Sequence, residues 1–74
     1  MKIAVKLFAT FRQGRFAVED REYPPGTTVG RIVAELGIPE QQLGIILVNS
    51  RHAKLDLSLD DGDTVAIFPL VGGG

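Results

Sequence analysis

One stretch decides the fold: residues 59–74, which read LDDGDTVAIFPLVGGG. It begins with a polar turn in which Gly62 is expected to adopt a positive φ. Thr64 to Phe68 then place alternate side chains on opposite sides, as in a half-buried strand. Pro69 and two apolar residues follow, and the last three residues are glycines. The stretch therefore predicts a strand in a sheet, followed by a tail with almost no side-chain bulk.

The beginning of the chain has the same strand periodicity. Lys2 to Phe8 alternate, with Ile3, Val5 and Leu7 on one side. After a loop that ends at Gly14, residues 15–18 alternate again, and Phe16 and Val18 are expected to face the core. Two such strands joined by a glycine-containing loop predict a hairpin, with the charged residues 19–22 at its solvated end. Phe8 and Phe11 are assigned to core or loop packing.

The middle of the chain predicts one helix. Residues 23–26 read YPPG and form a strong break, because each proline fixes φ and restricts the residue before it. Thr27 or Thr28 can cap the helix that follows. Gly37 supplies its C-terminal stop. The helix has one apolar stripe at helical spacing, made of Val29, Ile32, Val33 and Leu36.

The second half of the chain supplies further strands. Residues 45–48 are all apolar, which predicts a strand buried on both faces or nearly so. Residues 49–52 are expected to form a turn, and the alternation of Leu55, Leu57 and Leu59 predicts a short strand. The acidic turn before the last strand lacks the spaced ligands and closing glutamate of a calcium loop, so no metal site is predicted there.

The order strand, strand, helix, strand, short strand, strand predicts an α+β fold. It is the order of the ubiquitin-like β-grasp, a mixed sheet of four to five strands with one main helix packed on one face. We predict a β-grasp domain over residues 1–69 and a flexible C-terminal tail over residues 70–74. The sheet face opposite the helix is expected to have few charges and to carry Ala4, Lys6, Ala66 and Phe68.

Composition excludes several classes of function. There are 8 basic and 9 acidic residues, a net charge of −1, and the basic residues are scattered, so nucleic-acid binding is not expected. No apolar run approaches the length that crosses a bilayer, and a cytoplasmic protein without membrane contact is expected. The chain has no cysteine. Any sulfur that it handles must therefore come from elsewhere.

Several motifs together resemble the sulfur-carrier family of ubiquitin-like proteins. They are Leu47-Val48-Asn49, residues 59–69, Val71 and Gly73-Gly74. This family includes the molybdopterin synthase small subunit (MoaD) and the thiamine-pathway carrier (ThiS). The Phe-Pro pair at residues 68–69 favours the molybdopterin branch, whose tails commonly run Phe-Pro-Pro-Val-x-Gly-Gly. This chain departs from that pattern at Leu70, in place of the second proline, and at Gly72, in place of the variable residue.

The resemblance implies a carrier and co-substrate, not an enzyme with its own catalytic groups. A ubiquitin-activating-type adenylyltransferase would use ATP to adenylate the Gly74 carboxylate, which Gly73 leaves accessible. A sulfur donor such as a desulfurase would convert the adenylate to a thiocarboxylate. That group would give its sulfur to the molybdopterin synthase large subunit or to thiazole synthase. No tightly bound cofactor is implied.

Five residues are predicted to contact these partners: Phe68, Pro69, Leu70, Val71 and Gly72. Phe68 could instead cover the sheet edge, and the tail could be only a frayed terminus. Three alternative functions share the fold: a thiamine-pathway sulfur carrier, a ubiquitin-like protein modifier joined through Gly74, and a non-covalent binding module that ignores the tail.

Overall fold

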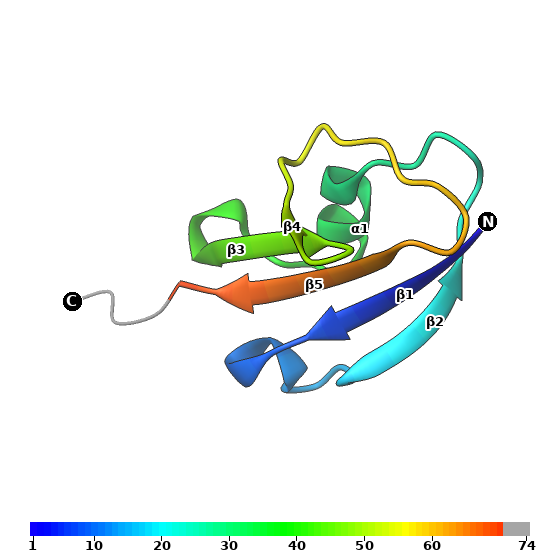
Figure 1. The fold of residues 1–74 in the computed structure, drawn as a ribbon. Helices are drawn as coiled ribbons and strands as arrows, with labels where there is room; N and C mark the ends of the chain where they lie inside the picture. The colour runs from blue at the N-terminus through cyan, green and yellow to red at the C-terminus, as the bar shows by residue number, and fades with distance from the viewer. Residues whose placement is uncertain (71–74) are drawn as a thin grey trace.

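The computed structural model describes residues 1–70, and within them the predicted strands and helix assemble into one mixed sheet with a helix on one face (Figure 1). The elements in chain order are β1 Lys2–Leu7, η1 Ala9–Arg12, β2 Val18–Glu22, α1 Val29–Glu35, η2 Glu40–Gln42, β3 Leu43–Val48, β4 Arg51–His52 and β5 Thr64–Pro69. Of the predicted tail, residues 70–74, only Leu70 is described, and residues 71–74 lie outside the described residues.

The strand order in the sheet is β2-β1-β5-β3-β4. The first and last strands pair in parallel, with Val5 opposite Val65 and Leu7 opposite Ile67. All other pairs are antiparallel. The strand that leads into the tail therefore runs through the middle of the sheet, where neighbours on both sides hold it. This arrangement confirms the predicted α+β class and the predicted last strand, and the strand order adds its central place in the sheet.

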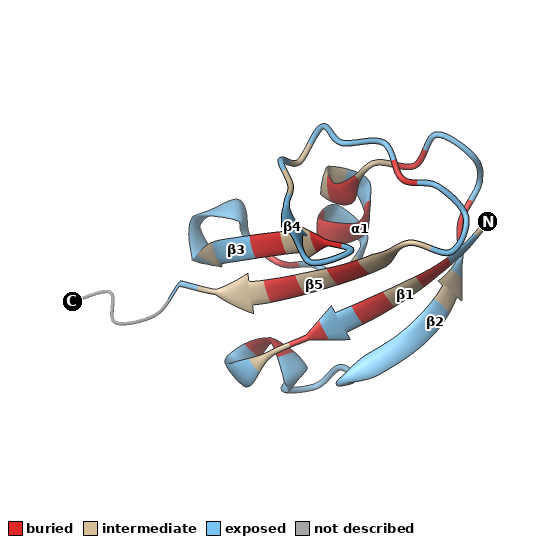
Figure 2. Cartoon of the chain, in the orientation of Figure 1, coloured by how far each residue is buried: buried red, intermediate tan, exposed pale blue. Residues whose placement is uncertain are grey.

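The core lies between the sheet and α1. Alternate residues of β1 and β5 are buried, which gives the bands along these strands in Figure 2. The residues that form this layer are Ile3, Val5, Leu7, Val65 and Ile67 from the sheet and Val29, Ile32 and Val33 from α1. A seven-residue helix is marginal alone, so packing on this layer is what stabilises α1.

Both predicted ends of the helix are confirmed. Thr28 is the N-cap, and its Oγ1 accepts a hydrogen bond from the backbone N–H of Arg31 at 3.2 Å. Gly37 follows the helix with a φ of +71°, which a residue with a side chain rarely adopts. Its N–H donates to the carbonyl of Ala34 at 3.0 Å, as expected at a helix C-terminus.

The predicted second strand is wrong in position. Residues 15–17 are not a strand, and β2 consists of the charged segment that we assigned to the end of the hairpin. Val18 is 59% exposed and does not face the core. The physical reason is that β2 is an edge strand, paired only with β1. Charged side chains on an edge strand prevent it from pairing with other chains. Because β2 buries no residue in the core, its sequence does not need alternating apolar residues.

The second hairpin also differs from its prediction. In β3 only Ile46 and Val48 are buried, and Ile45 is 49% exposed, so this strand is not buried on both faces. Arg51 and His52, predicted as part of a turn, form β4. The turn itself is only Asn49 and Ser50, with φ of +51° and +69°, which is the geometry of a tight two-residue hairpin.

The predicted short strand at Leu55, Leu57 and Leu59 is wrong. These residues are a loop with one isolated bridge, between Ser58 and Thr28. Leu59 is buried against the core, but Leu57 is 41% exposed. Their alternation comes from a loop that crosses the edge of the core, with backbone hydrogen bonds to the start of α1. The loop thus has no neighbouring strand with which it forms a continuous ladder of hydrogen bonds.

Candidate docking groove and exit of the tail

Only some of the predicted site residues lie within the part of the chain that the structure describes. Phe68, Pro69 and Leu70 are described, whereas the predicted reactive residues Gly73 and Gly74 and the predicted contacts Val71 and Gly72 lie outside residues 1–70. The structure therefore describes the surface from which the tail departs. Figure 1 shows this point at one end of the sheet, where β5 and β3 lie side by side.

The last residues of β5 extend past the end of β1. Pairing with β1 stops at Leu7 and Ile67, but pairing with β3 continues to Pro69, which lies opposite Leu43. Proline has no N–H to donate to a ladder, so a position beyond the end of one neighbour suits it. Leu70 then donates its backbone N–H to the carbonyl of Gln42 at 2.9 Å. The chain is therefore held on the β3 side as far as Leu70.

An apolar groove of about 440 Å³ lies beside this exit. It is lined by Phe8, Ala9, Gly44, Ile45, Leu47, Phe68, Pro69 and Leu70. We call this surface the docking groove. All three predicted contact residues within the described chain lie in it. The remaining lining residues are Phe8, just before η1, Ala9 in η1, and Gly44, Ile45 and Leu47 in β3, and the sequence did not predict them.

Two aromatic rings form one wall of the docking groove. Phe8 and Phe68 stack with their centroids 4.1 Å apart and their planes 10° from parallel. The guanidinium carbon of Arg12 lies 5.4 Å from the Phe8 ring centroid, and its Nε donates to the Leu7 carbonyl at 2.8 Å. Phe11 is buried in the core, as predicted. Phe8 is partly buried and packs on Phe68 from the loop after β1, which agrees with the predicted loop packing, and it also lines the groove. Its position just after a core strand gave no signal of this role.

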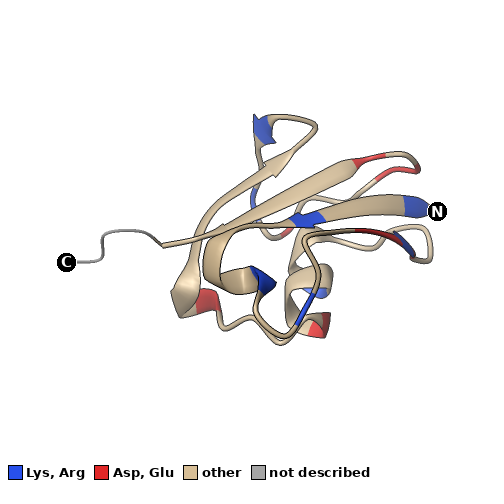
Figure 3. Cartoon of the chain, turned by 90° about the horizontal axis from the view of Figure 1, so that it is seen from below, with Lys and Arg blue, Asp and Glu red and all other residues tan. Residues whose placement is uncertain are grey.

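The groove displays apolar side chains that have no place in the core. Ile45 and Leu70 are 49% and 61% exposed, the second of these at the point where the described chain ends. Figure 3 shows this end of the sheet largely without charged residues, with Lys or Arg on β1 and η1 and an acidic residue close to the start of β3. An apolar patch with few charges at its centre is typical of the core of a protein interface. The surface beside the start of the tail therefore has the apolar character that is common at protein interfaces.

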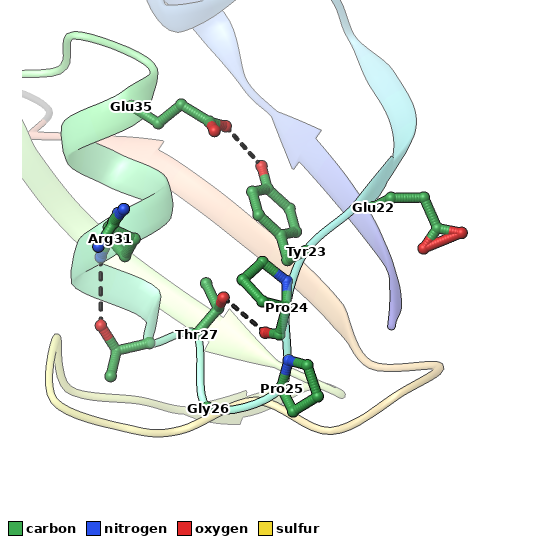
Figure 4. A pocket seen from close by; sticks show the side chains of 9 residues that line it. Glu22, Tyr23, Pro24, Pro25, Gly26, Thr27, Arg31 and Glu35 are labelled. Carbon is green, nitrogen blue, oxygen red and sulfur yellow. Dashed lines mark hydrogen bonds between the residues drawn. The ribbon is translucent and has the colours of Figure 1, made fainter.

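A second hollow, of about 600 Å³, lies between the end of β2 and α1 (Figure 4). The Tyr23 hydroxyl donates to Glu35 Oε1 at 2.8 Å, and Arg21 Nη2 lies 3.2 Å from the same oxygen. Burial, followed by the hydrogen bond to Glu35, raises the pKa of Tyr23 to about 12. This cluster joins the edge strand to the helix. These interactions hold β2 against α1 and so stabilise the fold, and we assign the cluster no catalytic role.

The described residues offer no grouping of side chains for a metal ion and no helix for a membrane. Residues 1–70 contain no group of three or more His, Cys, Asp or Glu side chains that could hold a metal ion. None of the helices in this part of the chain has the length and apolar character needed to cross a membrane. The described surface therefore offers a docking groove, and the reactive group predicted from the sequence belongs to the tail.

A mixed sheet with a parallel central pair, one helix across one face and a last strand that leads to the tail defines the ubiquitin-like β-grasp class. Within that class, the ThiS family model matches residues 5–74. The chain belongs to the ThiS family of small sulfur-carrier proteins. The match extends through the glycine tail, and the predicted family membership is thereby confirmed.

Solved structures agree with this assignment. A putative molybdopterin converting factor subunit 1 from Pyrococcus furiosus is 34% identical, with 96% of this chain and 99% of that chain covered and a TM-score of 0.75. SAMP1 from Haloferax volcanii is 24% identical, with both chains fully covered and a TM-score of 0.75. In a complex of subunits 1 and 2 of the molybdopterin-converting factor from Helicobacter pylori, the matching chain is 21% identical, with full coverage of both chains and a TM-score of 0.67. The last two likenesses concern the fold alone. The comparison with curated proteins gave no match.

Proposed function

We propose that this protein carries sulfur as a thiocarboxylate on Gly74 and delivers it in molybdopterin biosynthesis. One observation carries the proposal: the family match runs through the final glycines, and β5 leads directly to them from the edge of an apolar docking groove. The carrier domain supplies recognition, and the tail supplies the reacting group.

The proposed chemistry uses the terminal carboxylate as a nucleophile. A free α-carboxyl group has a pKa of about 3.3–3.7, so it is ionised at neutral pH. One carboxylate oxygen attacks the α-phosphorus of ATP in an adenylyltransferase, and pyrophosphate leaves. Hydrosulfide from a sulfur donor then attacks the acyl carbon, and AMP leaves with the electrons of the broken C–O bond. The product is a thiocarboxylate whose sulfur a second enzyme can transfer.

The partners must supply all catalytic groups in this scheme. The docking groove presents an aromatic pair and aliphatic side chains, and none of its eight lining residues carries an acid, a base or a thiol. Small glycine residues near the carboxylate suit entry into a narrow channel, because no Cβ widens the chain there. The proposal thus assigns binding to Phe8, Phe68 and their neighbours, and chemistry to enzymes that bind the same carrier in turn.

Two observations favour molybdopterin over thiamine as the destination. The relative at 34% identity is named a putative molybdopterin converting factor subunit 1. Residues 68–69 also carry the Phe-Pro pair of that branch. The Helicobacter pylori chain with the same fold was solved with its subunit 2, which supports a large-subunit partner for this chain as well.

The experiment has two stages. The purified chain is incubated with a cognate adenylyltransferase, ATP and sulfide, and its intact mass is measured. The expected gain is the mass difference between sulfur and oxygen, and a variant without Gly73 and Gly74 should show none. An unchanged mass in the full-length chain would reject the carrier function.

The second stage identifies the acceptor. The sulfurated carrier is given either to a molybdopterin synthase large subunit with its pterin precursor or to thiazole synthase with its substrates. Molybdopterin formation with the first enzyme alone is expected. Product from thiazole synthase alone would assign the chain to the thiamine pathway, and lysine-linked adducts of the chain would assign it to protein modification.

A further inference from the structure

Gly44 makes the tightest approach of any described glycine to another part of the chain. A Cβ at this position would lie 2.4 Å from the carbonyl oxygen of Pro69, 2.7 Å from its carbonyl carbon and 3.0 Å from the nitrogen of Leu70. These are backbone atoms of the segment that leads to the tail. Because they cannot move aside as a flexible side chain can, only glycine permits this contact.

The contact results from a bulge in β3. Leu43 lies opposite Pro69 and Ile46 lies opposite Ile67, so three steps along β3 match two steps along β5. The extra residue lets the start of β3 lie against the backbone of β5 as far as Leu70. A bulge is a known means of redirecting a strand beside a functional site.

A hydrogen bond completes the contact. The N–H of Leu70 donates to the carbonyl of Gln42 at 2.9 Å, at the first residue after β5. The β1 side gives no pairing here, since its ladder ends at Leu7 and Ile67. The direction in which the chain leaves the domain is therefore set from one side, by Gln42 and Gly44.

We propose that Gln42 and Gly44 form a clamp that fixes the exit of the tail and so positions the Gly74 carboxylate for activation. This inference rests on the proposed carrier function and deepens it. Four residues follow Leu70, and an extended chain spans at most about 3.3–3.6 Å per residue. The carboxylate then reaches roughly 13–14 Å from a fixed point. Gly44 is a positioning residue, since it acts through Pro69 and Leu70.

The clamp matters because activation needs a defined geometry. The carboxylate oxygen must approach the α-phosphorus of ATP while the domain is bound elsewhere on the enzyme. A displacement of about 1 Å in such a reaction can reduce its rate by about a hundredfold. With so short a tail, a shift of the exit at Leu70 is carried to the reacting end unless the tail conformation compensates.

The test compares Gly44→Ala with the matched control Gly30→Ala. A Cβ at Gly30 would lie 3.1 Å from the carbonyl oxygen of Leu55, so this change also crowds a backbone oxygen, but on α1 and outside the groove. Initial rates of ATP–pyrophosphate exchange with the adenylyltransferase give kcat and KM for each carrier. Calorimetric titration gives the Kd for docking, and urea unfolding shows that each variant is folded.

We expect Gly44→Ala to lower kcat by about tenfold or more, with a smaller change in KM and Kd, while Gly30→Ala retains wild-type rates. Equal kcat values for the two variants would overturn the clamp. So would a loss confined to KM and Kd, because Gly44 would then act only as a wall of the groove. A wild-type carrier that supports no exchange would instead reject the carrier function itself.

A second variant keeps the proposal testable if Gly44→Ala does not fold. One glycine inserted after Leu70 leaves residues 1–70 unchanged and lengthens the reach by about 3.3–3.6 Å. If the exit is fixed, kcat should fall by several-fold at an unchanged Kd. An unchanged kcat would show that the tail adjusts its own reach, which would contradict the clamp.

Discussion

Tyr23 gives the most quantitative prediction for the domain itself. The residue is 7% exposed, and its hydroxyl donates to Glu35 Oε1 at 2.8 Å (Figure 4). The perturbation is Tyr23→Phe, which retains the ring and removes only the hydroxyl. At neutral pH the variant should lose roughly 1–2 kcal/mol of unfolding free energy, because a hydrogen bond to a carboxylate is lost.

The pH dependence follows from the raised pKa. Tyr23 has a pKa of about 12 in the folded protein, against 10.0 for an ordinary tyrosine. The folded state therefore holds the phenolic proton more tightly than the unfolded chain does. This contribution is fully present below pH 10 and is lost as the pH rises from 10 to 12. Two pKa units correspond to at most about 2.7 kcal/mol.

The assay is urea unfolding at a series of pH values from 8 to about 12, run on both proteins. Above pH 10 the free energy of unfolding of the wild type should fall more steeply than that of Tyr23→Phe. The two plots of unfolding free energy against pH should therefore converge. Tyr23 is the only tyrosine in the chain, so its ionisation can be followed by absorbance without interference. Parallel curves across this range, or a tyrosine that titrates at its ordinary pKa, would refute the assigned burial and hydrogen bonding of the Tyr23 hydroxyl.

Two further predictions concern the docking groove and the second hairpin. Phe68→Ala should weaken docking to the large subunit by about thirtyfold, as expected of an aromatic interface anchor, whereas Leu57→Ala, exposed outside the groove, should leave the calorimetric Kd unchanged. A Kd for Phe68→Ala equal to that of the control would remove this residue from the interface. Asn49→Ala should cost roughly 2 kcal/mol in urea unfolding, because Asn49 has a positive φ, donates to Asp63 at 2.8 Å and accepts from the Thr64 N–H at 3.0 Å. A loss below about 0.5 kcal/mol would show that these bonds add nothing beyond solvent contacts.

The elements that pack in the core were predictable from the sequence. Alternation predicted β1 and β5 because each has one buried face. The apolar stripe, a cap at Thr27 or Thr28 and the stop at Gly37 predicted α1. In these segments local propensity and tertiary packing favour the same structure. The fold class followed from their order. The family resemblance then identified the tail as the candidate site.

The edge elements were not predictable in this way. The charged β2 and the two-residue β4 contribute no buried residue to the core, so hydrophobic periodicity gave no signal for them. A turn was predicted over residues 49–52, but its restriction to Asn49 and Ser50 was not, because neither of these two residues with positive φ is a glycine. Such segments are strands only because a neighbouring strand offers hydrogen bonds, and a single sequence does not reveal the neighbour.

The docking groove was predicted in part. The sequence suggested Phe68, Pro69 and Leu70 through their place beside the tail, but Phe8 and Gly44 come from distant parts of the chain. Their roles depend on the pairing of β5 with both β1 and β3. Leu70 stands where the family usually has a second proline, and the structure explains this departure. Unlike proline, Leu70 has a backbone N–H, which it donates to the carbonyl of Gln42.

The location of the added sulfur tests the central claim most directly. After incubation with the adenylyltransferase, ATP and sulfide, the chain is digested and its C-terminal peptide is fragmented in the mass spectrometer. The account predicts that the mass difference between sulfur and oxygen lies on Gly74 alone and depends on ATP. A modification on any other residue, or a C-terminal peptide of unchanged mass, would contradict it.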